Sequence, residues 1–284
     1  MDTLPQAPEE GAPDELGDRM KAFEQVTDTR LEPDRPTVIR LDGRAFHTFT
    51  RGLLRPFDPR LAALMRDTTL ALAEECNAAV AYTQSDEISL ILTRQSPNSD
   101  PYFGGRVQKL VSVLASLASV HFNRHLATHL PEKAHLRPVF DARAFQVPDL
   151  DTVAEVLKWR ELDAYRNGVL SLAQANFSHK EIQGKGRAQL LAMLLEKGVR
   201  FDVLPRHARG GSFLLKREVL REFTTDELDK LPEKHAARTN PDLMVKRAIR
   251  EFRDDLPPLA LTWNTVGVLF GGETPEHISQ DPNK

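Results

Sequence analysis

The first half of the chain alternates short runs rich in β-branched residues with longer stretches in which apolar residues recur at helical spacing. The first pattern is typical of strands and the second of amphipathic helices. Asp42-Gly43 is a tight-turn dipeptide, and Asp58-Pro59 pairs an N-cap carboxylate with a proline at the first helical position. The predicted elements are a strand at 37–42, a helix at 59–76, strands at 79–84 and 88–93, a helix at about 105–130 and a strand at 138–147.

This order of elements is strand, helix, strand, strand, helix, strand. The two central strands are joined by Ser85-Asp86-Glu87, which predicts an antiparallel hairpin. We therefore expect an α+β fold with a ferredoxin-like βαββαβ sheet, antiparallel, with both helices on one face.

The second half of the chain carries mainly helical signals. Ser178-His179-Lys180-Glu181 fits a capping box, and Gly198 is suited to end a helix. We expect this half to pack on the sheet instead of forming an independent domain. Its predicted elements are helices at 150–177, 187–197 and near 241–253, an extended segment at 201–217 and short strands at 259–263 and 266–270.

Composition places the chain among globular proteins with a substantial core, because 40% of its 284 residues are hydrophobic and 28% are charged. It has no apolar run long enough for a membrane span and no secretory signal pattern. Cys76 is its one cysteine, which excludes an internal disulfide framework and favours the reducing cytoplasm. Residues 1–17 read as a disordered acidic tail, and residues 273–284 as a second tail.

The net charge of −3 argues at first against a nucleic-acid partner. Residues 1–18, however, hold six acidic and no basic residues, so the remaining 38 basic and 35 acidic residues give a body of +3. Residues 180–253 carry 17 basic and 11 acidic residues. This distribution is compatible with RNA binding, but it also fits an ordinary solvated surface of mixed charge.

Asp42 and Asp86 occupy matching positions in the predicted topology. The first and third strands of a ferredoxin-like sheet are neighbours, so both carboxylates should reach one point, with the Gly43 carbonyl close by. Such an oxygen-rich site suits Mg²⁺, and two such ions about 4 Å apart promote displacement at phosphorus. This is the palm arrangement of nucleotide polymerases and cyclases. Alternatively, both aspartates are ordinary turn residues, and Glu87 is either a partner of metal-bound water or a solvated turn residue.

Three motifs carry a family resemblance. Residues 40–44 (Arg-Leu-Asp-Gly-Arg), Phe46-His47 and residues 81–87 (Ala-Tyr-Thr-Gln-Ser-Asp-Glu) resemble the tRNA(His) guanylyltransferase family. The resemblance runs from residue 17 through residues 140–143 to Trp159-Arg160 and continues more weakly to residues 240–242 and Asn264. It implies a palm-like catalytic domain at 18–148, completed by a mostly helical region at 149–272 that contacts tRNA.

The activity that this resemblance implies is the addition of nucleotides to the 5′ end of a tRNA. The 3′-hydroxyl of a nucleoside triphosphate attacks an activated 5′ phosphate, and pyrophosphate or AMP leaves. A 5′-monophosphate end is first activated with ATP. The implied substrates are GTP, ATP and other nucleoside triphosphates, two Mg²⁺ ions are expected, and the implied assembly is a homotetramer, a dimer of dimers.

The resemblance also implies roles for individual residues. Asp42, Asp86 and Glu87 would be catalytic, and Asp42, the Gly43 carbonyl and Asp86 would hold the magnesium ions. The nucleotide would be cradled by Asp42, Gly43, Arg44, Ala45, Phe46 and His47, together with Ser85 and Asp86. Contacts to phosphate or tRNA would come from Arg55, Arg143, Asn167 and Lys180.

One stretch departs from the family pattern. The eukaryotic enzymes that act on tRNA(His) carry His-Ile-Asn-Asn-Leu-Tyr-Asn after the Trp-Arg pair, and its histidine is tied to anticodon recognition. The aligned residues 165–171 read Tyr-Arg-Asn-Gly-Val-Leu-Ser, and only Asn167 matches. The chain therefore resembles the guanylyltransferase-like branch, which implies template-dependent 5′-end repair. The alternatives are dedicated G addition to tRNA(His), a cyclase-like palm enzyme that acts without RNA, and a non-catalytic binding module.

Overall fold

A six-stranded antiparallel sheet forms the centre of the molecule, here described from a computed structural model for residues 15–94, 96, 99–240 and 242–278. The strand order is β4-β1-β3-β2-β5-β6. The first four strands and helices α3 and α4 confirm the predicted ferredoxin-like arrangement. The strands are β1 (Thr37–Gly43), β2 (Val80–Gln84), β3 (Glu87–Leu92), β4 (Phe140–Gln146), β5 (Ser212–Glu222) and β6 (Met244–Arg253).

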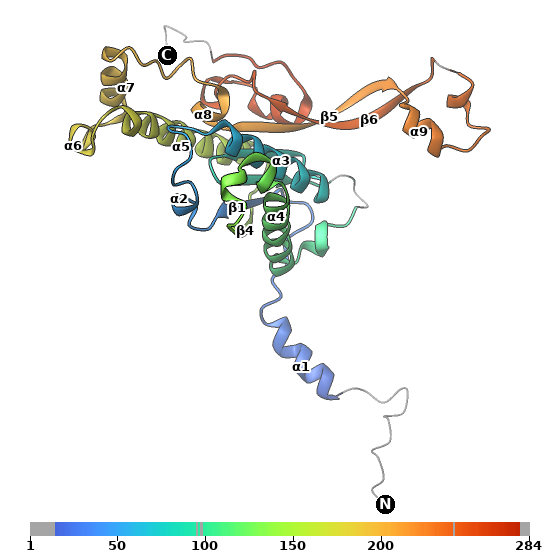
Figure 1. Ribbon diagram of the computed structural model, residues 1–284. Helices are drawn as coiled ribbons and strands as arrows, with labels where there is room; N and C mark the ends of the chain where they lie inside the picture. The colour runs from blue at the N-terminus through green and yellow to red at the C-terminus, as the bar shows by residue number, and fades with distance from the viewer. Residues whose placement is uncertain (1–14, 95, 97–98, 241, 279–284) are drawn as a thin grey trace, which may run out of the picture.

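Helices α3 (Pro59–Glu75) and α4 (Val107–His129) cover one face of this sheet, as Figure 1 shows. The Asp58 side chain accepts a hydrogen bond from the Arg60 backbone N–H, which confirms the predicted N-cap of α3. The core beneath these helices is apolar and closed to solvent. It includes Ile39, Leu41, Leu64, Leu72, Leu114 and Phe122.

Helix α5 (Leu150–Asn176) packs on the opposite face, where Tyr82, Phe213 and Leu157 form a second core. Its C-terminal half shares a third cluster with α7. The predicted capping box is confirmed, because Glu181 accepts a hydrogen bond of 2.7 Å from the Ser178 backbone N–H. The remaining helical segments are α1 (Glu15–Gln25), α2 (Phe46–Phe49), α6 (His179–Ile182), α7 (Arg187–Glu196), α8 (Arg206–Gly210), α9 (Thr225–Lys230) and short 3₁₀ turns at Tyr102–Gly105, Pro131–Lys133 and Ala236–Arg238.

The helix predicted near 241–253 is wrong, because this segment forms β6 and pairs with β5. The two strands form a long ribbon that projects beyond the body, with α9 near its far end (Figure 1). Adjacent charged residues interrupt both strands, as in Lys216-Arg217-Glu218 and Lys246-Arg247, so the sequence lacks the strict alternation that marks a strand on a core. The strands predicted at 259–263 and 266–270 are also wrong, since these residues form a 3₁₀ turn (Leu259–Leu261) and a π-helical turn (Gly267–Gly271).

The two predicted tails are only partly described. Residues 1–14 and 279–284 lie outside the described residues, whereas α1 begins inside the first predicted tail and extends away from the body (Figure 1). In the tail predicted at 273–284, the Ile278 N–H donates a 3.0 Å hydrogen bond to the Leu261 carbonyl, which links this segment to the rest of the chain. Within the described residues, every helix is too short or too polar to cross a membrane.

Gly211, at the start of β5, provides a test of this packing. Its backbone angles (φ 74°, ψ −173°) are essentially restricted to glycine, and an added Cβ would lie 2.5 Å from the buried Tyr82 hydroxyl oxygen. We expect Gly211→Ala to lower the free energy of unfolding by more than about 2 kcal/mol. Gly198→Ala is the control, because Gly198 also has positive φ (77°) but open space around it. Urea unfolding compares the two variants, and equal losses would contradict the packing argument.

Candidate active site

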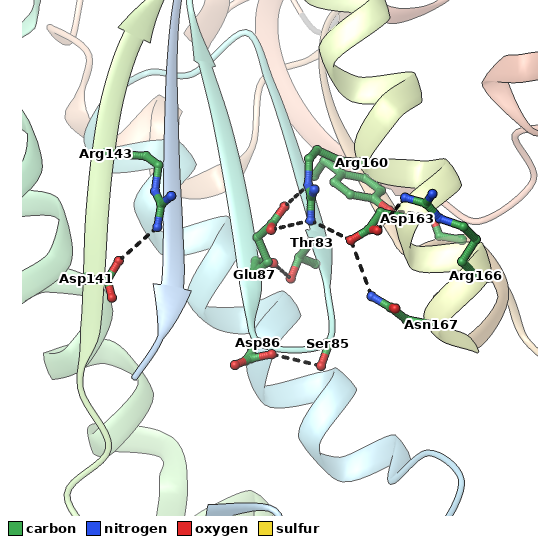
Figure 2. Close-up of polar contacts among 12 residues, drawn as sticks. Thr83, Ser85, Asp86, Glu87, Asp141, Arg143, Arg160, Asp163, Arg166 and Asn167 are labelled. Carbon is green, nitrogen blue, oxygen red and sulfur yellow. Dashed lines mark hydrogen bonds and ion pairs between the residues drawn. The ribbon is translucent and has the colours of Figure 1, made fainter. Parts of the chain in front are cut away.

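Asp42 and Asp86 come together at one end of the sheet. Asp42 is the second-last residue of β1 and lies opposite Glu87 of β3, and the Gly43 N–H donates a 3.1 Å hydrogen bond to the Asp86 carbonyl. Asp86 and Ser85 form the two-residue turn between β2 and β3, with Ser85 in the left-handed region (φ 50°) and its hydroxyl 3.0 Å from the Asp86 carboxylate. Figure 2 shows this turn. The predicted convergence of the two aspartates is therefore confirmed by the geometry.

The two carboxylates stand in an environment that disfavours their charge. Burial raises the pKa of Asp42, and the nearby Asp141 raises it further. Burial also raises the pKa of Asp86, to which the charge of Asp42 adds, although the Ser85 hydroxyl opposes the shift. Each ionised carboxylate thus raises the cost of ionising its neighbour. A bound cation would relieve this repulsion.

The donor set fits an open Mg²⁺ site better than a metal site that protein ligands close completely. Among the described residues, no group of three or more His, Cys, Asp or Glu side chains could hold a metal ion. Two carboxylates and a backbone carbonyl leave half of the six positions of an octahedral ion to water and substrate phosphates. Mg²⁺ is usually bound in this way.

Glu87 is held by α5. It is buried, and its two carboxylate oxygens accept hydrogen bonds from Nε and Nη2 of Arg160, both at 2.7 Å. Figure 2 shows the paired groups facing each other between β3 and α5. The bidentate geometry fixes the start of β3, directly after Asp86, to the helix. The catalytic role predicted for Glu87 stays a prediction, and its observed contact is with Arg160.

A polar chain continues from Arg160 along α5. Asp163 accepts hydrogen bonds from Arg160 (3.1 Å), Arg166 (2.7 Å) and Asn167 (3.4 Å). Asn167, a predicted phosphate or tRNA contact, is thereby oriented by Asp163. Although the Trp159-Arg160 pair is part of the recognised motif, its sequence did not reveal the role of Arg160, because the acid that it neutralises lies far away in the chain.

A cavity of about 680 Å³ opens beside the two aspartates. Its lining includes most of the predicted site: Asp42, His47, Arg55, Ser85, Asp86, Glu87 and Asn167. It also contains Arg51, Arg66 and His207, which sequence reasoning missed. Burial lowers the pKa of His207, and the positive charge of Arg66 lowers it further. The cavity therefore combines carboxylates at one wall with several cations.

Other predicted residues lie outside the cavity lining. Phe46 points into the core, with its ring 5.4 Å from that of Phe122, and a Cβ at Gly43 would come within 2.3 Å of it. Gly43 is thus needed for the close approach of this ring. Arg44 and Ala45 contribute backbone at the start of α2, where the first N–H groups of a helix have no intrahelical acceptor. Arg143 (β4) and Lys180 (α6) also lie outside the lining.

Comparison with known proteins agrees with this fold. Residues 17–148 match the sequence profile of the family described as tRNAHis guanylyltransferase. A solved bacterial tRNA(His) guanylyltransferase-like protein in complex with ATP is 36% identical, with a TM-score of 0.68, and the match covers 70% of this chain and 88% of that one. A second, in complex with GTP, is 28% identical, with a TM-score of 0.67 and coverage of 87% and 94%.

A further relative is an uncharacterised protein of Acanthamoeba polyphaga mimivirus, 34% identical over 230 residues, which are 72% of this chain and 78% of that protein. The palm-like fold and the family match define the protein as a nucleotidyltransferase. Within that class, the chain belongs to the tRNA(His) guanylyltransferase family.

The buried Glu87–Arg160 pair predicts unequal effects of removing its two partners. Arg160→Met leaves Glu87 buried without the one ion-pair partner that it has among the described residues. Glu87→Gln leaves Arg160 its second carboxylate, Asp163. We expect Arg160→Met to lower the free energy of unfolding by about 3–5 kcal/mol and Glu87→Gln by clearly less. Urea unfolding of both variants and of the double variant measures this, and equal losses would contradict it.

The raised pKa values of Asp42 and Asp86 predict that ionisation of these carboxyls lowers the free energy of unfolding. An aspartate titrates near pH 3.9 when unfolded and higher in this site, so the folded state retains protons that the unfolded state has lost. Stability should therefore fall as pH rises through that window. Asp86→Asn removes this loss, so its melting temperature in EDTA should exceed that of the wild type at pH 7 and converge with it below about pH 4.

The exposed Asp202 provides a control of opposite sign. A hydrogen bond from Arg200 lowers the pKa of Asp202, so Asp202→Asn should not stabilise the protein at pH 7. A destabilised Asp86→Asn protein in EDTA would contradict the electrostatic account of the site.

Proposed function

We propose that the protein adds nucleotides to the 5′ end of a tRNA in the 3′–5′ direction, with GTP, ATP and other nucleoside triphosphates as substrates. The observation that carries the proposal is the convergence of Asp42 and Asp86 on one wall of a cavity that also presents arginines. The complexes of two related bacterial proteins with ATP and GTP support nucleotide binding here.

Asp42, the Gly43 carbonyl and Asp86 would hold two Mg²⁺ ions. When bound, these ions would lower the pKa of the attacking hydroxyl and neutralise charge on the leaving group. Arg51 and Arg55 on the cavity wall supply positive charge for the triphosphate, since guanidinium groups form charge-assisted hydrogen bonds with phosphate. His47 and Ser85 complete the predicted cradle around the nucleotide.

The transfer forms one bond and breaks one. The 3′-hydroxyl oxygen of the incoming nucleotide attacks the 5′ phosphorus of the RNA, loses its proton, and displaces pyrophosphate from a triphosphate end. A 5′-monophosphate end is first adenylylated by ATP, which releases pyrophosphate, and AMP then leaves in the transfer step. Asn167, Arg143 and Lys180 are the proposed phosphate or tRNA contacts.

Template-dependent repair of truncated 5′ ends is the proposed role within this activity. Its support is the altered stretch at 165–171, where Asn167 alone matches the pattern of enzymes dedicated to tRNA(His). The proposal includes the homotetramer that the family resemblance implies and the cytoplasmic location expected from the single cysteine.

A 5′-extension assay tests the activity. Purified protein, Mg²⁺, all four nucleoside triphosphates and a tRNA lacking its first nucleotide should yield the nucleotide that pairs with the opposing acceptor strand. Asp86→Asn should abolish the product, because one metal-binding charge is lost with little change in volume. Asp202→Asn, which removes an exposed carboxylate elsewhere, should retain full activity.

The other outcomes separate the rival functions. Addition of an unpaired G to tRNA(His) alone would indicate dedicated maturation. Triphosphate turnover without RNA would indicate a cyclase-like enzyme. Full activity of Asp86→Asn would refute the proposed metal site.

A further inference from the structure

A polar surface lies beside Asp42, outside the cavity. It consists of Arg40 on β1, Asp141 and Arg143 on β4, and Trp159 on α5, and we call it the β4 shelf. Arg40 lies directly opposite Arg143, and Asp42 directly opposite Asp141, in the β1–β4 register. Alternate residues of a strand share a face, so the side chains of these two opposed pairs all project from the α5 side of the sheet. On that side α5 does not cover Arg143 on β4, the edge strand of the sheet, and the Arg143 side chain is 54% exposed.

Two like charges, Arg40 and Arg143, lie opposite each other on the shelf. Among the described residues, Arg40 makes no hydrogen bond or ion pair, and the nearest carboxylate oxygen to Arg143 belongs to Asp141 at 3.7 Å. Like charges directly opposite each other on neighbouring strands are destabilising. Burial lowers the pKa of Arg40, which Arg143 and Arg160 lower further, although Glu87 opposes them. An anion on the shelf would relieve this repulsion.

Trp159 adds an aromatic surface to these charges. It is 49% exposed and does not line the cavity. The guanidinium of Arg160 lies 4.5 Å from its ring centroid and that of Arg40 lies 5.5 Å away. Arg160 is held by Glu87, whereas Arg40 has no hydrogen bond or ion pair among the described residues. Exposed aromatic rings beside arginines are the surfaces on which unpaired bases of RNA pack.

We propose that the β4 shelf binds the 5′-terminal segment of the RNA substrate, with a base packed on Trp159 and backbone phosphates at Arg40 and Arg143. The inference rests on the proposed function and assigns its RNA end to one side of Asp42. Arg40 and Asp42 are two residues apart on one face of β1, or about 6.8 Å. RNA crossing the shelf would therefore end at the metal-binding carboxylates, which the triphosphate reaches from the cavity.

Fluorescence tests occupancy of the shelf. The chain has two tryptophans, so in Trp263→Phe the emission reports on Trp159 alone. We expect a tRNA with a 5′-monophosphate to quench this emission and ATP alone to leave it unchanged. Absence of quenching by the tRNA would overturn the proposal, and so would equal quenching by ATP, which would indicate a free nucleotide on the shelf.

Binding measurements test the contacts. Arg143→Ala should weaken tRNA binding severalfold and reduce the slope of log affinity against log salt by about 1, while ATP binding is unchanged. Arg35→Ala is the matched control, because the Arg35 side chain is equally exposed (53%) and also pairs with a neighbouring carboxylate. Arg35 lies just before the first residue of β1, at the end of the strand away from Asp42. Trp159→Ala should weaken tRNA binding at least about fivefold, and Trp159→Phe should restore most of it.

Two failures are distinguishable. Normal 5′ extension with unchanged tRNA affinity in Arg143→Ala and Trp159→Ala would overturn the shelf and leave the proposed function intact. Quenching of Trp159 by tRNA without any nucleotide transfer would refute the proposed function and support the shelf as an RNA-binding surface.

Discussion

The antiparallel register of β1 against β3 is the constraint on which the site depends. It places Asp42 opposite Glu87 and therefore beside the turn that carries Asp86. The same register sends Ile39 and Leu41 into the core beneath α3 and α4, while Arg40 and Asp42 face α5. A shift by one residue would exchange these two sets and bury both charges. Core packing and the position of the Asp42 carboxylate are thus consequences of one set of backbone hydrogen bonds.

The charges at this end of the sheet are only partly balanced. Glu87 and Arg160 neutralise each other in a bidentate pair that ties the hairpin to α5. Asp42, Asp86 and Asp141 remain close together on one side, and Arg40 faces Arg143 on the other. Such imbalance is costly for folding, and it suits a site that receives cations and polyanions together. The neutral pair lets α5 approach the carboxylates without adding a fourth unbalanced acid to Asp42, Asp86 and Asp141.

Asp42 stands between two different surfaces. On one side is the cavity with Arg51 and Arg55, and on the other is the shelf with Trp159. A transferase that joins a small triphosphate to a long RNA needs a confined space for one substrate and an open path for the other. The arrangement of α5, which covers β2 and β3 but leaves β4 accessible, provides that asymmetry.

The sequence by itself determined the elements with strong local signals. The N-cap at Asp58 and the short strand runs predicted most of the first half, and the capping box at Ser178 predicted a helix start in the second. Topology then predicted the meeting of Asp42 and Asp86. Tertiary structure decided the rest: β6 in place of a helix, Arg160 as the partner of Glu87, and the inward turn of Phe46. Caps and apolar periodicity act between residues a few positions apart, so they can be read along the chain. The β6 pairing, the buried ion pair and the ring packed on Gly43 depend on partners brought together only by folding.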